Sequence, residues 1–331
     1  MRKLYRFPLL IALCWAAVGC AQQDPMFTKY VFNGLAFNPA YAGSKDHLTF
    51  NLLHRSQWVG LEGAPKTQSF SVHSPLRGQH LALGFSLVND QIGAIGNTDL
   101  NTDYAYRIKM PNGWQLSLAL QASLTNWRSN WAKLDLEDVG DEAFNENISS
   151  WFPNFGAGVY LHSERFYVGF GVPRLIENNL RKAKLEAATV YARTYRHYYT
   201  TVGVAIPLKN KNVVFRPSAL LKSTGWFSSL RQDALSLPVG SPTELDVDAA
   251  FFLLETLWLG VAYRTALEGR NSSHDSADLY ASWYFRNGLR VGAAYDIALS
   301  KIRKAAGGSF ELMLGYEFDT KIKRVATPRY F

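Results

Sequence analysis

The sequence predicts an all-β protein, a transmembrane antiparallel up-and-down β-barrel of about 14 strands. Segments that alternate apolar and polar side chains recur from residue 49 to residue 318, and the connections between them are short and long in turn. Outer-membrane barrels place apolar residues outward and polar residues inward, with short turns at one end and longer loops at the other. Aromatic residues make up 14% of the chain, which suits the aromatic girdles of such barrels.

The chain opens with an expected signal peptide, residues 1–20. Basic residues precede a short apolar run that ends in small residues, which is the pattern of a cleaved export signal. The stretch Ala17–Cys20 fits ordinary signal peptidase, and it also fits lipoprotein processing that leaves Cys20 acylated. Both routes stay open. Because the other cysteine, Cys14, lies inside the signal, we expect no internal disulfide and no thiolate metal site in the mature chain.

Residues 21–48 are polar and aromatic and lack the alternation of a strand. We expect this segment to fold into the lumen as a plug or to lie beneath the barrel in the periplasm. Residues 49–318 form the predicted outer-membrane barrel. Residues 319–331 form a basic tail that we expect on the periplasmic side.

The predicted strands have ends accurate to a few residues. They cover residues 49–58, 66–74, 80–89, 100–110, 114–126, 154–162, 165–172, 198–207, 213–223, 245–253, 257–263, 278–285, 289–295 and 309–318. The clearest, 114–126, places leucines on one face and mainly polar residues on the other, and a tilted strand of about 9–11 residues crosses a bilayer. Acidic residues at alternate strand positions, such as Asp246 and Glu311, are expected to line a wet lumen.

Short connections such as 110–113 and 285–288 carry the Pro, Asn and Gly that tight turns need. Longer polar stretches lie between them, at 90–99, 127–153, 173–197, 224–244, 264–277 and 296–308. An even strand number places both termini on the periplasmic side and the long loops outside the cell. Since loops on a rigid scaffold commonly carry binding, the aromatic, polar stretch Trp127–Trp151 is an expected contact loop.

The sequence lacks the motifs of common enzymes. It contains no Gly-x-Ser-x-Gly, His-Glu-x-x-His or P-loop pattern, and its 7 histidines are scattered. The pairs Gly156/Gly158 and Gly169/Gly171 occupy alternate strand positions, which indicates small side chains on one barrel face. We therefore expect no enzyme, catalytic residue, cofactor or metal site, although an outer-membrane protease or lipase stays open. The modest excess of 35 basic over 27 acidic residues predicts solvated loops and no nucleic-acid partner.

The mature chain resembles the PorP/SprF family of Bacteroidetes outer-membrane proteins. The matching motifs follow in the family's order along the chain. They are Gln22–Tyr30, Phe37–Gly43, Arg55–Trp58, Gly63–Thr67, Asn89–Gly93 and Pro328–Phe331. The specific motifs lie in the first part of the mature chain, and a diffuse barrel pattern follows them.

The resemblance implies an outer-membrane component of type IX protein secretion, and of gliding motility where family members serve gliding adhesins. The implied partners are an exported protein with a C-terminal sorting domain, other type IX secretion components and outer-membrane lipid. The protein would receive or anchor the exported protein at the cell surface. Two alternatives stay open: a channel or transporter for small solutes with an N-terminal hatch, and a structural anchor in the cell envelope.

The matching motifs supply candidate residues for structure or partner binding. They are Asn33, Asn38, Pro39, Ala40, Gly43, Arg55, Gln57, Trp58, Gly60, Pro65, Asp90 and Gly93. A proline after Asn38 favours an extended backbone there, and Gly43 permits a sharp exit toward the first strand. Arg55 and Gln57 are expected on one face of that strand, with Trp58 on the other. Packing between plug and barrel explains these residues more simply than cargo contact does.

Overall fold

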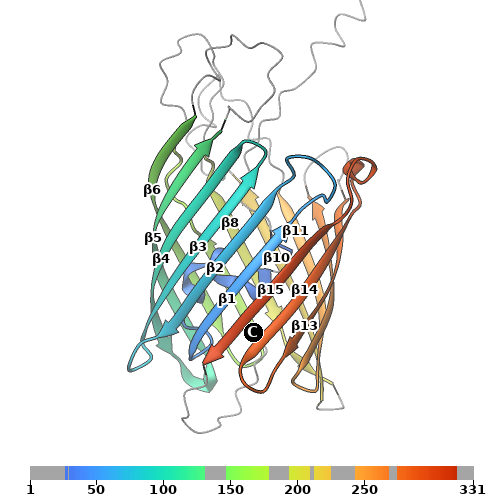
Figure 1. Cartoon of the computed structure of the whole chain (residues 1–331). Coiled ribbons are helices and arrows are strands. Elements are labelled where there is room, and N and C mark those ends of the chain that lie inside the picture. Colours follow the sequence, from blue (N-terminus) through green and yellow to red (C-terminus); the bar gives the residue numbers. More distant parts are fainter. Residues whose placement is uncertain are drawn as a thin grey trace, which may run out of the picture.

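A computed structural model describes residues 27–28, 30–130, 147–178, 194–208, 212–224, 243–267 and 274–318. The expected signal peptide with Cys20 and the basic tail 319–331 lie outside these residues. The described strands form one closed antiparallel sheet, in which each strand lies beside its neighbours in sequence (Figure 1). Within the described residues, no helix has both the length and the apolar character needed to cross a membrane.

The strands follow the order of the chain. They are β1 (Leu48–Ser56), β2 (Lys66–Pro75), β3 (Leu81–Ile92), β4 (Ile95–Lys109), β5 (Gln115–Ser129), β6 (Ile148–His162), β7 (Phe166–Val172), β8 (His197–Val204), β9 (Ile206–Pro207), β10 (Val213–Thr224), β11 (Glu244–Leu253), β12 (Leu257–Ala266), β13 (His274–Tyr284), β14 (Leu289–Ala298) and β15 (Ser309–Phe318). Short 3₁₀ helices are η1 (Tyr30–Phe32), η2 (Gly34–Ala36), η3 (Pro39–Tyr41), η4 (Pro111–Gly113) and η8 (Lys301–Lys304).

The barrel has the predicted number of strands. β8 and β9 pair with β10 in one continuous register, so they form a single strand interrupted at Ala205. Counted in this way, the 15 segments of the sheet make a 14-strand barrel. β1 pairs with β15 along its whole length, and this pairing closes the barrel. The prediction of a closed antiparallel barrel is confirmed.

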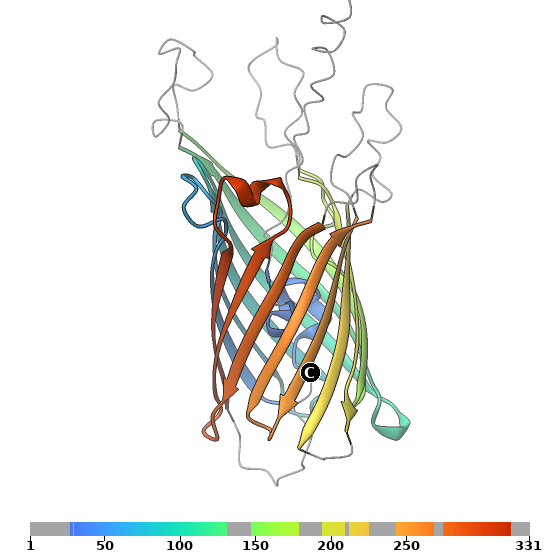
Figure 2. The ribbon, with the colours of Figure 1, turned by 90° about the vertical axis from the view of Figure 1, so that its right-hand side faces the viewer.

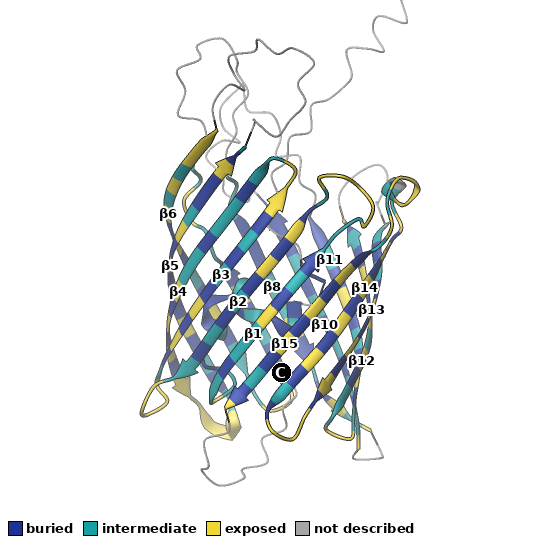
Figure 3. Ribbon diagram, in the orientation of Figure 1, coloured by how far each residue is buried: buried dark blue, intermediate teal, exposed yellow. Residues whose placement is uncertain are grey.

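Buried and exposed residues alternate along the strands, as Figure 3 shows. On β5, Leu118 and Leu120 are 44% and 67% exposed on the outer wall, while Ser117 and Gln121 are buried on the inner face. Side chains of a strand point alternately to its two faces, so the apolar set meets lipid and the polar set meets the lumen. The alternation of apolar and polar residues in the sequence therefore indicates which side chains face outward and which face the lumen.

Short turns gather at one end of the barrel and longer connections at the other (Figure 2). At the short-turn end, the β4–β5 turn has Asn112 and Gly113 at φ values of 60° and 76°. These left-handed conformations are the ones that Asn and Gly adopt most readily. We call the opposite end the long-loop end.

One predicted loop is wrong. Residues 90–99 do not form a long connection, because β3 continues to Ile92 and β4 begins at Ile95, with Gly93 at φ 55° in the tight turn between them. The strands from β3 to β6 project beyond their neighbours at the long-loop end (Figure 1). There both faces of a strand carry polar residues, so composition alone does not distinguish strand from loop.

Both ends of the contact loop predicted at Trp127–Trp151 belong to strands, and residues 131–146 lie outside the described residues. Trp127 lies on β5 and is 8% exposed, and Trp151 lies on β6 and is 55% exposed on the outer wall. In contrast, the first strand is shorter than predicted. β1 ends at Ser56, and Trp58 has a φ of 47°, so Gln57 and Trp58 do not occupy opposite faces of a strand.

The outer wall yields a test of the fold. Leu120→Arg places a charge on the lipid-facing wall, where an arginine costs about 2–4 kcal/mol near the bilayer midplane. We expect that loss in the free energy of unfolding, measured by urea titration of protein folded into vesicles. Ser149→Arg is the control, because it lies on the same wall near the long-loop end, where the cost falls to about 0–1 kcal/mol. Equal losses in the two variants would contradict the assignment of lipid-facing positions.

Candidate functional site

The N-terminal part of the described chain lies inside the barrel (Figure 2). We call residues 27–28 and 30–47 the luminal segment. Near the long-loop end, the carbonyl oxygen of Phe27 accepts a hydrogen bond of 3.1 Å from Nη2 of Arg264. Near the short-turn end, Nε2 of His47 lies 3.3 Å from Oε2 of Glu317. The segment therefore runs along the lumen before it joins β1.

A cluster of buried charges holds the start of the luminal segment. Nη1 of Arg55 lies 2.6 Å from Oδ2 of Asp296 and 3.7 Å from Oε2 of Glu311. The backbone N–H of Thr28 donates to Oε2 of Glu311 at 2.8 Å, and its hydroxyl donates to Oδ2 of Asp296 at 3.0 Å. Buried charges need such partners because the lumen wall removes most of their water. The cluster links β1, β14 and β15 to the segment.

Aromatic side chains pack the middle of the luminal segment against β12, β13 and β14. The ring of Phe32 meets the rings of Trp258 and Tyr280 edge-on, with centroids 6.1 Å and 5.9 Å apart. The guanidinium of Arg290 lies 4.7 Å from the centroid of the Phe32 ring, which is a cation–π distance. Farther around the barrel, Phe37 packs edge-on against Tyr199 of β8 at 5.1 Å. The segment thus contacts several strands of the lumen wall.

Glycines on β6 and β7 receive the turn at Asn38. A Cβ atom added at Gly158 would lie 2.1 Å from Oδ1 of Asn38, and one added at Gly171 would lie 2.3 Å from the carbonyl oxygen of Phe37. Asn38 is fixed there, because its Nδ2 donates to the carbonyl of Val159 at 2.9 Å and its Oδ1 accepts from the N–H of Ala40 at 2.9 Å. We call Gly158, Gly169 and Gly171 the glycine cradle.

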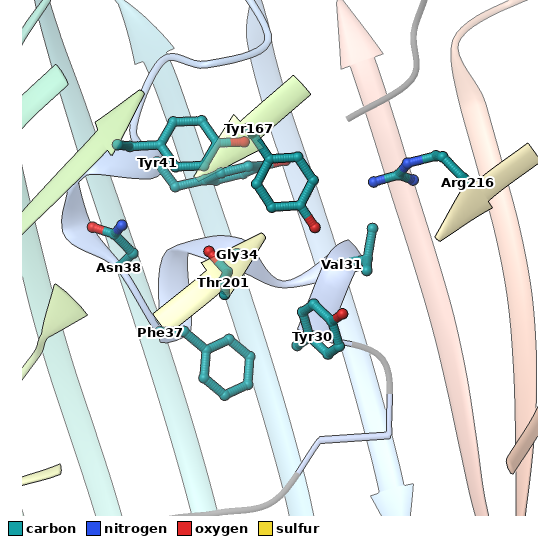
Figure 4. Close-up of a pocket in the computed structure, with 10 residues that line it drawn as sticks. Tyr30, Val31, Gly34, Phe37, Asn38, Tyr41, Tyr167, Thr201 and Arg216 are labelled. Carbon is teal, nitrogen blue, oxygen red and sulfur yellow. The ribbon is translucent and has the colours of Figure 1, made fainter. Parts of the chain in front are cut away.

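Two small cavities lie beside the luminal segment. One residual cavity holds about 30 Å³ and is lined by residues of the segment and by Tyr160, Tyr167, Thr201 and Arg216 (Figure 4). A second, beside Phe27 and Phe37, holds about 20 Å³. Each volume suits a water molecule or two, since one water needs about 10–15 Å³.

The candidate motif residues fall into three groups. The first belongs to the luminal segment and consists of Asn33, Asn38, Pro39, Ala40 and Gly43, all of which are buried. Nδ2 of Asn33 donates to Oγ of Ser69 at 3.3 Å, and the N–H of Gly43, at φ 75°, donates to Nδ1 of His73 at 3.1 Å. This group binds the segment to β2 and β6.

Two further motif residues lie on the inner face of the barrel wall. Arg55 on β1 belongs to the charged cluster with Asp296 and Glu311. Asp90 on β3 is buried, and its Oδ1 accepts a hydrogen bond of 2.5 Å from the hydroxyl of Thr67. Both side chains therefore serve contacts within the barrel.

The third group lies at the long-loop end. Gln57, Trp58, Gly60 and Pro65 lie in the β1–β2 connection, and Gly93 lies in the β3–β4 turn. The N–H of Gly93 donates to the carbonyl of Gly63 at 2.9 Å, so the two connections are joined.

The same connection also reaches the β14–β15 loop on its other side. The N–H of Val59 donates to the carbonyl of Gly308 at 3.0 Å, and the N–H of Gly307 donates back to the carbonyl of Val59 at 2.8 Å. We call residues 57–65, 93–94 and 299–308 the rim.

Sequence reasoning missed the role of the glycine cradle. The Gly-x-Gly spacing on two successive strands indicated a face of small side chains. The sequence did not show that the turn at Asn38 packs against this face. It also missed Asp296 as a partner of Arg55, since the two are far apart in the chain. Among the described residues, no group of three or more His, Cys, Asp or Glu side chains is arranged to hold a metal ion.

Comparison with known proteins identifies one family. The model of the type IX secretion system membrane protein PorP/SprF matches residues 19–316, which is most of the chain. No match was found among the curated proteins.

Several solved outer-membrane proteins are similar in fold. The Acinetobacter baumannii outer membrane protein Omp33 has a TM-score of 0.45 and 11% identity, over 83% of this chain and 100% of that one. A Pseudomonas aeruginosa FadL homologue has a TM-score of 0.46 and 14% identity, over 82% and 90%. The CymD monoaromatic hydrocarbon channel has a TM-score of 0.47 and 12% identity, over 87% and 93%. These likenesses concern the fold alone.

The glycine cradle yields a prediction about stability. Gly171→Ala forces a methyl group against the backbone at Phe37, and such overpacking costs about 1–3 kcal/mol. We expect this loss in the free energy of unfolding, measured in urea. Gly96→Ala, on β4, is the matched control, since its nearest neighbouring atom would lie 3.7 Å away. If the two variants are equally stable, the luminal segment does not sit in the cradle.

The charged cluster yields a second prediction. Arg55→Met leaves Asp296 and Glu311 buried without their cation, which costs about 3–5 kcal/mol. The triple variant Arg55→Met, Asp296→Asn, Glu311→Gln removes the charges together, so it should recover part of that loss in the same urea titration. A triple variant less stable than Arg55→Met alone would show that the cluster is not held together by its charges.

Proposed function

This chain belongs to the PorP/SprF family of type IX secretion system membrane proteins, and from that premise we propose that it receives or anchors an exported protein at the cell surface. The barrel is an outer-membrane component of that system. In our proposal, the exported protein binds through its C-terminal sorting domain, and the binding surface is the rim.

We propose that the long-loop end faces the cell exterior and the short-turn end faces the periplasm. Bacterial outer-membrane barrels carry short periplasmic turns and longer extracellular loops, and the described connections follow that division. β15 ends at Phe318 at the short-turn end, which supports a periplasmic position for the basic tail 319–331. Phe27 lies toward the long-loop end of the lumen, so the described residues lend no support to the expected periplasmic N-terminus.

The observation that carries the proposal is the position of the luminal segment inside the barrel. We propose that this segment acts as a plug, because it packs against the wall and two cavities beside it hold about 30 Å³ and 20 Å³. The segment is held by buried charges at one end and by the glycine cradle at its middle. A folded export domain therefore meets the ends of the barrel and not a passage through it.

The rim has the properties of a contact surface. Val59 and Leu61 in the β1–β2 connection are 47% and 38% exposed, and exposed apolar side chains that lie together can form an interaction site. Backbone hydrogen bonds fix residues 57–65 to the connections on either side. A rigid loop loses little conformational freedom on binding, which favours affinity.

The rival function is a channel for small solutes with the luminal segment as its hatch. Solute passage would require the segment to leave its buried ion pairs and its cradle. The small residual cavities favour the secretion role, and the following experiment separates the two.

The test compares secreted and surface proteins of the parent strain and of a clean deletion of this gene by mass spectrometry. We expect one or more type IX substrates to be lost from the surface and to accumulate inside the cell. Loss of a few proteins indicates a cargo-specific partner, and loss of nearly all indicates core machinery. An unchanged set of exported proteins would contradict the proposal and favour the solute channel.

The rim itself is tested by the double variant Val59→Asp, Leu61→Asp. We expect loss of surface retention of the affected cargo by about tenfold or more, since burying carboxylates in an interface is costly, while the amount of folded barrel is unchanged. The control is Leu76→Asp, because Leu76 is 40% exposed at the short-turn end. Normal cargo retention in the rim variant would exclude the rim as the binding surface.

A further inference from the structure

The outer wall of the barrel is nearly free of charge except at one place. Among the described strand residues that face away from the lumen, Lys66 on β2 and Arg128 on β5 are the only cations. Both are exposed and lie at the long-loop ends of their strands. Neither forms an ion pair with a described acidic side chain, and this includes Glu62 in the adjoining connection. Unpaired cations on a membrane-facing wall suggest an anion from outside the chain.

A row of polar side chains lies directly below the two cations. His54, Gln68, Asn89 and Thr98 are cross-strand neighbours on β1 to β4, and all face outward. The guanidinium of Arg128 donates to Oγ1 of Thr98 at 3.1 Å and to Oδ1 of Asn89 at 3.4 Å. The cation is thus oriented over the row.

Other parts of the wall differ at this end. On β11, β14 and β15 the outward residues nearest the long-loop end are Leu245, Ile297 and Phe310. On β1 to β4, by contrast, the outward residues at this end are polar, so the apolar band ends earlier along these strands. Polar side chains at the edge of the apolar band can hydrogen-bond the polar part of a lipid.

An apolar groove continues from the polar row toward the short-turn end. It holds about 620 Å³ and opens on the outer wall between β14 and β3. Its outward lining consists of Leu52, Phe70, Leu87, Val291, Leu312 and Leu314, with His54, Gln68 and Asn89 at its upper edge. The volume lies within the range of about 300–1,000 Å³ found for ligand sites. At this depth in the wall, the matching ligand group is a hydrocarbon chain.

We propose that this surface binds a phosphate-bearing lipid of the outer leaflet. An acyl chain lies in the groove, the polar row hydrogen-bonds the headgroup, and Lys66 and Arg128 pair with its phosphate. The guanidinium fork suits phosphate geometry, and the cations lie where the apolar band ends, which is the headgroup level. A soluble anion would use the cations but not the groove. The inference rests on the proposed orientation and is independent of the exported cargo.

The experiment uses the full mature barrel in phosphatidylcholine nanodiscs with increasing fractions of diphosphoryl lipid A. The readout is the shift of the thermal unfolding midpoint, which reports a ligand that binds the folded state. We expect a saturable increase for the natural sequence. Lys66→Gln, Arg128→Gln should weaken the apparent affinity about 30-fold, since each basic residue at a membrane surface contributes a factor of about five. Inorganic phosphate added alone should produce no shift.

The control is Lys109→Gln, Arg165→Gln, which removes the same charge from exposed residues at the short-turn end. It should keep the full response to lipid A. Equal responses of all three proteins, or an equal response to free phosphate, would overturn the proposal. A photo-crosslinker at Gln68 should label lipid in cells, and its attachment to a polypeptide instead would assign the surface to a protein partner. None of these results depends on secretion, so they distinguish this site from the rim.

Discussion

The pairing of β1 with β15 is the constraint on which the rest of the structure depends. Each residue from Leu48 to Ser56 lies in register with a residue of β15, so neither end of the sheet presents free N–H and C=O groups to lipid. Each such group would cost several kcal/mol in hydrocarbon. Closure also separates an inner face from the membrane, and this separation permits Arg55, Asp296 and Glu311 to exist at membrane depth.

Closure creates a second requirement, because an inner face rich in charges needs partners. The luminal segment supplies some of them through Thr28 and Phe27, and strand-to-strand pairs such as Arg264 with Asp246, 2.7 Å apart, supply others. Since burial without a partner is strongly unfavourable, segment and wall stabilise each other. The glycine cradle then allows the turn at Asn38 to approach the wall closely. If the luminal segment acts as the proposed plug, the ends and the outer wall of the barrel are the surfaces open to partners.

The proposed contact surfaces share the same part of the barrel. The rim joins the β1–β2 connection to its neighbours on both sides. The polar row on β1 to β4 lies below it, and the groove opens on the wall between β14 and β3. The long strands from β3 to β6 support both. A partner bound at the rim would therefore stand above the lipid headgroups that the wall is proposed to bind. Under these two proposals, the exported protein would bind beside a defined patch of membrane.

The sequence by itself determined the barrel, its strand number and the face on which most side chains lie, because alternation with period two is a local property of each strand. It also determined the family, through motifs between residues 22 and 93. The sequence did not place the ends of strands that project from the membrane, as at residues 90–99, since both faces are polar there. Only the tertiary structure decided which residues meet. Arg55 pairs with Asp296 because the sheet closes, and Gly171 contacts the backbone at Phe37 because the luminal segment enters the barrel. Neither contact is indicated by a local pattern in the chain.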